Sequence, residues 1–533
     1  MDCTSTHIPY HQTGAFSRIV LDYIDGSDNL GPFAGFPPSE EGVQKAIEAR
    51  KQFPTNRQLL VEELKKQYAA LKTTDLVQKN IDSLLSPDTF TITTAHQNNI
   101  FTGPLFFIYK ILHAVRIARH LNGSFPNCKF VPVYYMGSED ADLDELNHIY
   151  LDGEKISWNT QQSGAVGRMK IDQELIKLVD VIEGQLAVLS RGKEAIALIR
   201  DCYRLGEDVQ SATFKIVNAL FAEFGLVVLL PDNAHLKRQM DHVFKDDLLN
   251  QAASAIVAET SAKLGEQYKV QAHPREINLF YLKDNLRERI ELRGSKYEVL
   301  NSKLSLTKEE LLTELREHPE RFSPNVILRG LYQETILPNI VFIGGGGELA
   351  YWLELKKLFE HYKVPYPVQV LRNSFLLIEK KCQEKIKKLG FTNEDIFLPE
   401  EELLNRLVSR ETDKKLQLNG TLTATEQLYE SIKKQAASID ITLEKHVDSL
   451  KTASIHRLRE LEKKMLRAEK RKFADQQHQI ISIKKKLFPG SGLQERYDNL
   501  FYYYAKWGQA FINKLEEHSL SLDQKFVVLS ITD

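Results

Sequence analysis

The amino-acid sequence predicts an α/β protein with a Rossmann-like, doubly wound core, small inserted connecting domains and a C-terminal helical coiled-coil domain. Three observations support this fold class. Strand-like apolar runs alternate with helical runs through the first part of the chain, which is typical of a parallel sheet. Four consecutive glycines, Gly344 to Gly347, separate one strand from its helix. Residues 423–487 are rich in charge and contain neither proline nor glycine.

The length of 533 residues predicts two or three domains, because one hydrophobic core seldom serves so long a chain. Shifts in pattern divide the chain into four parts. These are a core at 1–390 with a small antiparallel β insertion near 267–300, a connecting segment at 391–422, an α-helical coiled-coil domain at 423–518, and a C-terminal strand at 519–533 that returns to the core.

Charge and cysteine usage exclude several classes of protein. Lys and Arg number 70 against 72 Asp and Glu, so nothing favours a nucleic acid or an anionic membrane as partner. The N-terminus has no signal-peptide pattern, and no apolar run approaches the roughly 20 residues that span a bilayer. The four cysteines are scattered without a C-x-x-C pair, so no zinc or other metal site is evident. These features predict a reduced, cytoplasmic protein.

The core elements follow one another as strand, helix and strand. TFTITTAH at 89–96 predicts a strand, 103–121 a helix, and KFVPVYYMG at 129–137 a second strand, which together form a right-handed βαβ unit. A buried strand is expected at 225–232, followed by a long helix from about Ala234. Two more strands, at 340–343 and 366–371, flank a helix that begins at Glu348.

Two further segments have patterns of their own. Alternating apolar and polar residues within 267–300, parted by Asp284–Asn285 and Gly294–Ser295, predict β-hairpins. Apolar or small residues from Leu443 to Ala468 recur at steps of three and four, which predicts a long helical hairpin or coiled coil. The Pro489–Gly490 pair that follows is a helix stop.

The glycine turn is the first candidate site. It lacks the Walker pattern, but Gly345, Gly347 and Ala350 fit the dinucleotide pattern G-x-G-x-x-[G/A]. The acid that would hold a ribose is absent, and the next strand ends at Arg372, which leaves an NADP 2′-phosphate site as an alternative. A helix start that presents free N–H groups to an anion fits better, and tight packing alone is the remaining reading. The substrate-binding candidates here are Gly344, Gly345, Gly346, Gly347, Glu348, Tyr351, Trp352 and Arg372.

The second candidate site lies where the first strand ends and its helix begins. In open α/β sheets this is where ligands bind, so His96 and Gln97 become catalytic candidates. Thr102 and Gly103, at the helix start, and Lys110, two turns further on, are candidates for substrate binding. A structural role for each of these side chains remains open.

The third candidate site is the acidic run MGSEDADLDELNH, which directly follows the second strand. Carboxylates at this place can bind an ammonium group, hold Mg²⁺ or accept a proton. Asp144 and Glu145 equally suit the acidic first turn of a solvated helix. The candidates are Glu139, Asp140 and Asp142 as catalytic residues, with Asn147 and His148 for substrate binding.

The chain resembles a known family along essentially its whole length. The segments IFTGPLFFIYK, VPVYYMGSEDADLDELNH, FSPNVILRGLYQETILPNIVFIGGGGELAYW and LFPGSGLQER, in this order, are similar to the bacillithiol-biosynthesis cysteine-adding enzymes, the cysteine ligase family. The resemblance implies a Rossmann-type core akin to class I aminoacyl-tRNA synthetases and a homodimer formed through the coiled coil. It implies a reaction that joins cysteine to glucosaminyl-malate and gives bacillithiol. The chain departs from the family pattern at Ala141, where a histidine is usual.

Amide formation from a free carboxylate is uphill in water, so the carboxylate must be activated. ATP, with Mg²⁺, is the economical activator, and the two carboxylates of the malate half call for arginine forks. Arg275, Arg329 and Arg372 are the candidates, although each could be a structural ion pair. Two alternatives to a ligase remain, an NADP-dependent oxidoreductase and a non-catalytic coiled-coil scaffold.

A second nucleotide site, for ATP or ADP, is predicted near the end of the long helix. A basic helix end, a glycine turn, an arginine and stacking rings are the parts that an adenine nucleotide would use. The alternative is that the lysines complement the helix dipole and the rings pack the core. The residues of this prediction are Lys486, Gln494, Arg496, Tyr504 and Trp507.

Overall fold

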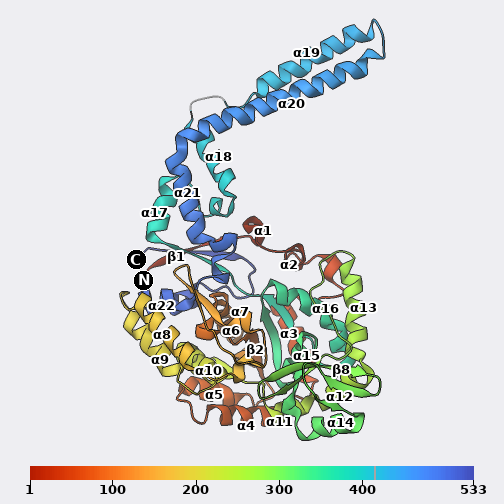
Figure 1. Ribbon diagram of the computed structural model, residues 1–533, viewed down its shortest axis with the longest axis vertical. Coiled ribbons are helices and arrows are strands. Elements are labelled where there is room, and N and C mark those ends of the chain that lie inside the picture. The colour runs from red at the N-terminus through yellow and green to blue at the C-terminus, as the bar shows by residue number, and fades with distance from the viewer. Residues whose placement is uncertain (413–415, 533) are drawn as a thin grey trace. The chain divides into compact units, whose positions relative to one another are not determined.

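A computed structural model describes residues 1–412 and 416–532, and the chain divides into two compact units. The first unit comprises residues 1–377 and 492–532, and the second comprises residues 378–491 (Figure 1). Of the predicted coiled-coil domain, 423–518, residues 423–491 belong to the second unit and residues 492–518 to the first. Of the predicted connecting segment, residues 413–415 lie outside the described residues, as does residue 533 of the predicted C-terminal strand.

The centre of the first unit is a five-stranded parallel sheet in the order β13-β12-β2-β3-β6. Its strands are β2 Thr89–Gln97, β3 Lys129–Gly137, β6 Val227–Leu229, β12 Asn339–Gly344 and β13 Val368–Leu371. Chain order runs outward from β2 in one direction and from β12 in the other, so the predicted doubly wound topology is confirmed. The switch point lies between β2 and β12, where Thr94 pairs with Ile343.

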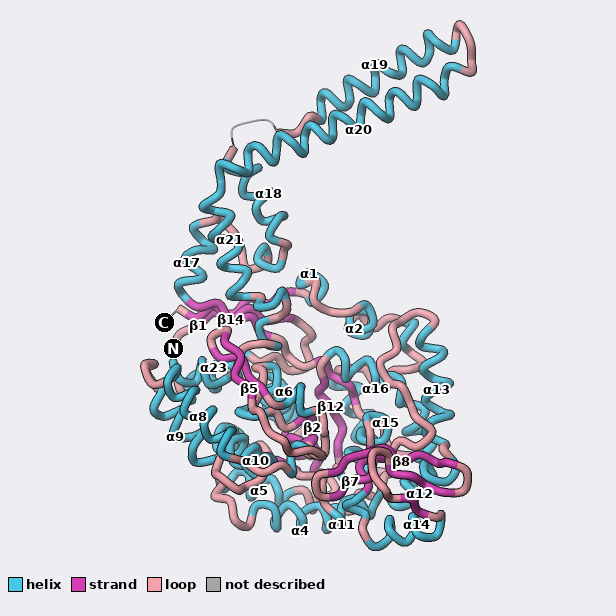
Figure 2. The backbone as a smooth tube through the Cα atoms, viewed as in Figure 1, coloured by secondary structure: helices cyan, strands magenta, loops and turns pink. Residues whose placement is uncertain are grey.

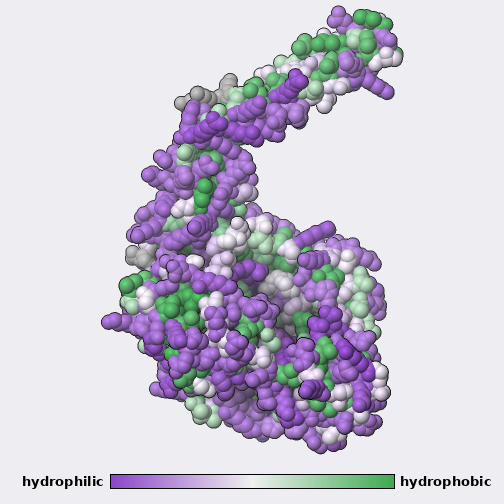
Figure 3. Space-filling view, viewed as in Figure 1, coloured by the Kyte–Doolittle hydropathy of each residue, from purple (hydrophilic) through white to green (hydrophobic). Residues whose placement is uncertain are grey.

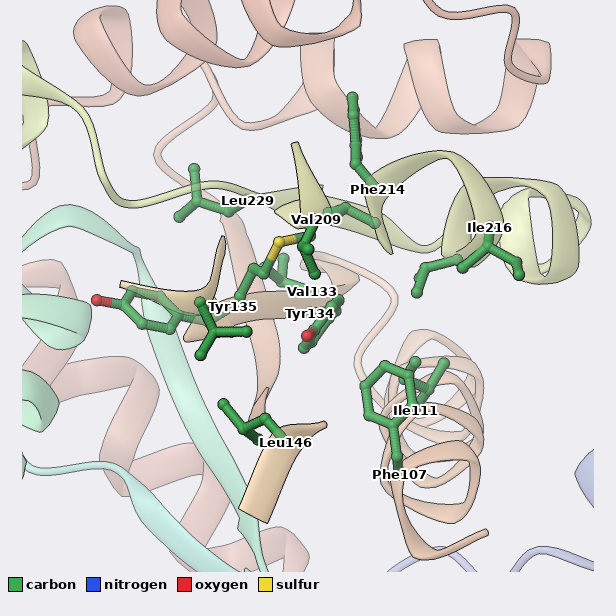
Figure 4. Packing of buried hydrophobic residues seen from close by; sticks show 14 of the residues in the cluster. Phe107, Ile111, Val133, Tyr134, Tyr135, Leu146, Val209, Phe214, Ile216 and Leu229 are labelled. Carbon is green, nitrogen blue, oxygen red and sulfur yellow. The ribbon is translucent and has the colours of Figure 1, made fainter. Parts of the chain in front are cut away.

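Helices flank the central strands (Figure 2), and apolar side chains cover both faces of this sheet. Successive residues of a strand point to opposite faces, so Phe342 joins one core cluster while Val341 and Ile343 join the other. Figure 4 shows Phe107 and Ile111 of α6 (Phe106–Ser124) in the larger cluster, with residues of β3 and of α10 (Val209–Phe221). The other helices of the first unit up to residue 202 are α1 Tyr10–Thr13, α2 Arg18–Ile24, α3 Glu40–Lys51, α4 Arg57–Tyr68, α5 Asp75–Ser83, α7 Leu143–Leu146, α8 Gln173–Leu186 and α9 Gly192–Cys202.

The long helix expected from Ala234 is interrupted. It forms three pieces, α11 Ala234–Lys237, α12 Asp241–Asn250 and α13 Ala252–Gly265. Gln251 separates the last two with a φ of +56°, a left-handed conformation that no α-helix can contain. The helical pattern was read correctly, but the breaks were missed because no glycine or proline marks them.

The antiparallel insertion is confirmed and is larger than predicted. Its five strands, in the order β10-β9-β8-β7-β11, reach to residue 324 rather than ending near residue 300. Both predicted turns are present, with positive φ at Asp284 and Gly294. The elements are β7 Leu279–Lys283, β8 Leu286–Arg293, β9 Lys296–Val299, β10 Ser305–Leu306, α14 Lys308–Glu317 and β11 Phe322–Pro324, followed by α15 Val326–Ile336 and α16 Gly346–Tyr362.

The two ends of the chain meet in a third sheet. Its middle strand, β15 Phe526–Ile531, pairs antiparallel with β1 Cys3–Ile8 and neighbours β14 Phe375–Glu379. The helices α22 Leu500–Trp507 and α23 Gln509–His518 precede β15, and a separate hairpin joins β4 His148–Leu151 to β5 Glu154–Ser157. The chain thus returns to the first unit after the second unit is complete.

The second unit is helical and contains the predicted hairpin. Its helices are α17 Lys380–Lys388, α18 Glu400–Glu411, α19 Asn419–Ala437, α20 Leu443–Lys470 and α21 Ala474–Leu487. Side chains join α19 to α20, including Tyr429 to Ser454 at 2.7 Å and Lys433 to Asp448 at 2.7 Å. Both helices carry exposed apolar side chains, and Figure 3 shows apolar surface along them. Within the described residues, no helix is both long and apolar enough to cross a membrane.

Candidate active site

A cavity of about 620 Å³ lies at the carboxyl ends of the central strands, beside the switch point. Its walls come from the ends of β2 and β3, the start of α16, the insertion and the segment that follows the second unit. The predicted residues that line it are His96, Gln97, Lys110, Asp140, Arg329, Gly345, Gly346, Gly347, Glu348, Tyr351, Arg372 and Arg496.

Asp140 is held in a two-pronged ion pair with Arg329. The Arg329 guanidinium donates to both carboxylate oxygens, at 2.9 Å from Nη1 to Oδ2 and in a shorter contact from Nη2 to Oδ1. Arg287 lies 3.8 Å away on the same carboxylate. Burial alone would raise the pKa of Asp140, but the two arginines outweigh it and hold this pKa below its ordinary value. Asp140 is therefore an ionised anchor for two arginines and a poor proton acceptor.

Glu139, the neighbour of Asp140, faces the other way and does not line the cavity. Its carboxylate pairs with Lys237, which also donates to Asp232 at 3.0 Å. Arg168 completes this buried group with a 2.7 Å bond to Asp232. Consecutive residues after a strand point in different directions, so only one of the two acids reaches the cavity. This arrangement gives no support to the catalytic role predicted for Glu139, because its carboxylate pairs with Lys237 in a buried network.

Four other predicted residues lie away from the cavity. Asp142 is exposed at the start of α7, and Arg275 is exposed on the segment before the insertion sheet. Asn147 and His148 bond each other, with 3.1 Å between Oδ1 and Nδ1. The loop instead presents Glu145 to the cavity. Burial, with the nearby Asp142 and Asp140, raises the pKa of Glu145, which makes it a better proton acceptor than Asp140.

The four glycines differ in what they allow. A Cβ on Gly344 would lie 3.0 Å from both Glu348 and Phe342, so a side chain here would be tightly packed. Gly345 is the N-cap of α16, and its N–H donates to the Glu348 carboxylate at 2.8 Å. A Cβ on Gly347 would meet no protein atom within 4 Å. The turn therefore combines a packing glycine with an open helix start, whose first N–H groups have no intrahelical acceptor.

The buried Lys110 pairs with Glu348, whose side chain is 23% exposed, beneath this helix start. The Lys110 ammonium also donates to the carbonyl oxygen of Ala95 at 2.9 Å. Burial lowers the pKa of Lys110, although the Glu348 carboxylate counteracts it. The pair ties the end of β2 to the start of α16 across the switch point.

Arg372 lines the cavity with its charge already compensated. Its guanidinium donates to Glu495 at 2.6 Å and to Ser374 at 3.1 Å, and its carbon lies 5.1 Å from the centre of the Phe106 ring. The main-chain N–H of Arg372 donates to Gly344 at 2.8 Å. The ion pair with Glu495 accounts for Arg372 without an NADP 2′-phosphate, so the oxidoreductase alternative has no observation of its own.

His96 packs between aromatic rings at the end of β2. It stacks on Phe107 at 5.1 Å and 29° and meets Phe106 edge-on. Burial and the nearby Lys110 and Arg372 lower the pKa of His96 well below its ordinary value, so the imidazole is neutral near pH 7.

Three residues predicted to bind substrate, Thr102, Gly103 and Trp352, do not line the cavity and pack behind the residues that do. Thr102 and Gly103 have φ values of +69° and +61°, and a Cβ on Gly103 would lie 2.5 Å from the Asn99 side chain. Trp352 is buried, with its ring 4.5 Å from that of Phe342.

Several lining residues were missed by the sequence analysis, namely Tyr135, Phe280, Arg287 and Asn325. Arg287 lies on β8 of the insertion, 4.0 Å over the Phe280 ring. Arg287 lies among other charged residues of β8. Its position in the sequence therefore gave no sign that this side chain, rather than a neighbouring one, lines the cavity. Asn325 had a signal, because it precedes a helical run as an N-cap and accepts from the Ile327 N–H at 2.9 Å.

The predicted second nucleotide site is dispersed. Arg496 lines the cavity described above, whereas Lys486 belongs to the second unit and pairs with Glu379. The Gln494 amide bonds the main chain of Leu377, and Trp507 stacks with Tyr503 and Phe511. Tyr504 donates to Glu194 at 3.5 Å. The packing alternative for these rings is the one that the contacts support.

The lining charges favour an anionic ligand. Five cationic side chains, Lys110, Arg287, Arg329, Arg372 and Arg496, face three carboxylates, Asp140, Glu145 and Glu348. The start of α16 adds the positive end of a helix dipole. The arrangement suits a substrate that carries carboxylate or phosphate groups, with Glu145 available for proton transfer.

Comparisons with known proteins agree along the whole chain. Residues 1–373 match the family described as "Bacillithiol biosynthesis BshC, N-terminal Rossmann-like domain", and residues 375–531 match its "C-terminal coiled-coil domain". A Flavobacterium psychrophilum protein is 38% identical over 531 residues, which cover 99% of each chain. A Flavobacterium johnsoniae protein is 38% identical over 532 residues, again 99% of each chain. Both proteins carry the name "Putative cysteine ligase BshC".

Proposed function

Because this chain belongs to the BshC family of bacillithiol biosynthesis, we propose that it is a cysteine ligase that joins cysteine to glucosaminyl-malate through an amide bond. The observation that carries the proposal is the cationic cavity at the switch point, with Asp140 anchoring Arg329 and Arg287. Two carboxylates on the malate half match guanidinium forks, which bind such groups through paired hydrogen bonds. A reducing, cytoplasmic location is part of the proposal and suits four free cysteines.

The residues of the chain have distinct tasks in this proposal. Arg329 and Arg287 bind and orient the acidic substrate, and Glu145 accepts the proton of the attacking amine. The N–H groups at Gly346 and Gly347 stabilise negative charge on a bound phosphate or carboxylate.

ATP fits the helix start, because the open space over Gly347 admits a phosphate close to the main chain. ATP, when bound there, supplies the activation of the cysteine carboxylate. Asp140 and Glu348 are both paired with cations, so the Mg²⁺ that accompanies ATP would be held mainly by its phosphates.

The direct test is a ligation assay with purified protein, cysteine and glucosaminyl-malate, with and without Mg-ATP, read by mass spectrometry. We expect bacillithiol only when cysteine, glucosaminyl-malate and ATP are all present. Two controls test the substrates separately. Glucosamine replaces glucosaminyl-malate in the first, and serine replaces cysteine in the second. Formation of bacillithiol without ATP would refute the proposed activator, and no product with all components would refute the ligase.

We also propose that the hairpin of α19 and α20 forms a homodimer. Ile432 and Leu450, from the two helices, are 38% and 45% exposed and would be covered in the dimer. The double substitution Ile432→Lys and Leu450→Lys is expected to give a monomer by light scattering, with helix content unchanged. Val188→Lys, at an exposed apolar residue of the first unit, is the control and is expected to keep the wild-type mass. A double variant with that same mass would contradict the dimer interface.

A further inference from the structure

A short segment that follows the second unit, residues 494–499, contacts and fixes two parts of the cavity wall. Its first residue, Gln494, bonds β14 as a neighbouring strand would, accepting from the Leu377 N–H at 2.9 Å and donating to the Leu377 carbonyl at 3.3 Å. The segment therefore has a fixed position in the first unit, although more than a hundred residues of chain separate it from β14.

Glu495 is the fully buried member of this segment and reaches the cavity wall. One carboxylate oxygen accepts from Arg372 at 2.6 Å and from the Ser374 hydroxyl at 3.2 Å, and the other accepts from the Phe375 N–H at 3.3 Å. The carboxylate thus has partners on both oxygens, and the side chain has little freedom to turn.

Arg372 is consequently clamped between Glu495 and the glycine turn. Its Nε lies 3.5 Å from the place of a Cβ on Gly345, and its flat face covers the Phe106 ring. A planar guanidinium binds an anion well only when its plane is set in advance. Glu495 fixes that plane by accepting from Nη2, while Nη1 donates to the Asn373 carbonyl oxygen and the Ser374 hydroxyl.

Asn499 gives the same support to a second wall. Its amide donates to the carbonyl oxygens of Phe101 at 2.8 Å and Gly103 at 2.7 Å. Phe101, Thr102 and Gly103 all have positive φ, a costly conformation that persists only where surrounding contacts impose it. Residues 494–499 therefore fix both the loop that precedes α6 and the end of β13.

We propose that Glu495 is a positioning residue of the ligase, which orients Arg372 toward the anionic group of the substrate. The inference rests on the proposed function, and Glu495 itself does not touch the cavity. Removing its charge leaves the Arg372 guanidinium buried without its anion and free to tilt.

The kinetic test compares two buried arginine–carboxylate pairs of the same kind. Glu334 pairs with Arg50 at 2.7 Å, as deeply buried as Glu495 and Arg372, and neither Glu334 nor Arg50 lines the cavity. We expect Glu495→Gln to raise the KM of an anionic substrate at least about tenfold, the cost of one charge-assisted hydrogen bond. Glu334→Gln is expected to lower the melting temperature and leave KM unchanged. Glu495→Asp, which keeps the charge, is expected to recover part of the loss and covers the case that Glu495→Gln does not fold.

A second measurement does not depend on ligase activity. Phenylglyoxal labelling, read by mass spectrometry, is expected to modify the exposed Arg496 in every variant and Arg372 much faster in Glu495→Gln than in wild type. If the wild type makes no bacillithiol, the ligase proposal fails, and the labelling alone decides the positioning role. Wild-type KM with wild-type Arg372 labelling in a folded Glu495 variant would overturn the inference, as would wild-type labelling where no activity exists.

Discussion

Asp140→Asn is expected to lower kcat/KM for ligation at least about a hundredfold, which corresponds to roughly 2.7 kcal/mol of transition-state stabilisation. The substitution keeps the side-chain volume and removes the charge that Arg329 and Arg287 share. Two guanidinium groups would then repel each other in the cavity wall, and their fork toward the substrate would be lost. Steady-state kinetics below the unfolding transition measures the effect.

Asp144→Asn is the matched control, because Asp144 belongs to the same acidic run and is exposed on α7. It is expected to keep turnover within about twofold of wild type. Equal, small effects of both substitutions would mean that the acidic run is only a solvated loop.

Asp140→Asn is also expected to change how the free energy of unfolding depends on pH. The pKa of Asp140 lies below its ordinary value in the folded protein, so the pairing stabilises the fold above the unfolded pKa of about 3.9 and is lost as pH falls through the folded pKa. Asp140→Asn should therefore be less stable than wild type near neutral pH, and the difference should shrink as the pH approaches the folded pKa. Denaturant unfolding at pH 7 and pH 3 checks the sign.

Gly347→Val is expected to lower kcat/KM about a hundredfold or more while the melting temperature stays near that of wild type. A Cβ at this position meets no protein atom within 4 Å, so the fold has room for the side chain. The added methyl groups would occupy the space over the helix start, where the proposed ligand must approach the main-chain N–H groups. The kinetic loss therefore reports a ligand rather than a packing defect.

Gly184→Val is the control, because Gly184 lies in α8 and a Cβ there also meets no protein atom. It is expected to have wild-type kinetics and equal or slightly higher stability, because valine has a better helix propensity than glycine. Gly344→Ala is expected to behave in the opposite way, with lower stability, because its Cβ would press on Glu348 and Phe342. Full turnover by Gly347→Val would mean that the turn exists for packing alone.

Much of the fold follows from local pattern. The strands at 89–97, 129–137 and 339–344, the helix after the glycines and both turns of the insertion are marked by periodicity and turn residues. Residues 500–518 are helical like the hairpin but belong to the first unit, and the sequence pattern did not separate the two groups of helices. Helical pattern identifies a helix and does not identify its neighbour.

The candidate site likewise has residues that strand ends predicted and residues that only the fold could identify. The switch point, the glycine turn and the acidic run follow from the positions of strand ends, and with them His96, Gln97 and Asp140. Arg329 was one of three arginines proposed for substrate binding. It lines the cavity, whereas Arg275 is exposed elsewhere.

The sequence by itself determined the α/β class, the order of the core strands along the chain, the helical hairpin and the family. Only the tertiary structure decided that Asp140 rather than Glu139 faces the cavity. It also decided that Arg287 of the insertion lines the cavity, and that Glu495 binds Arg372, which is 123 residues away in the chain. The physical reason is that periodicity reports which side of an element is buried. The partner of a buried charge depends on which distant segment packs against it, and no local pattern encodes that choice.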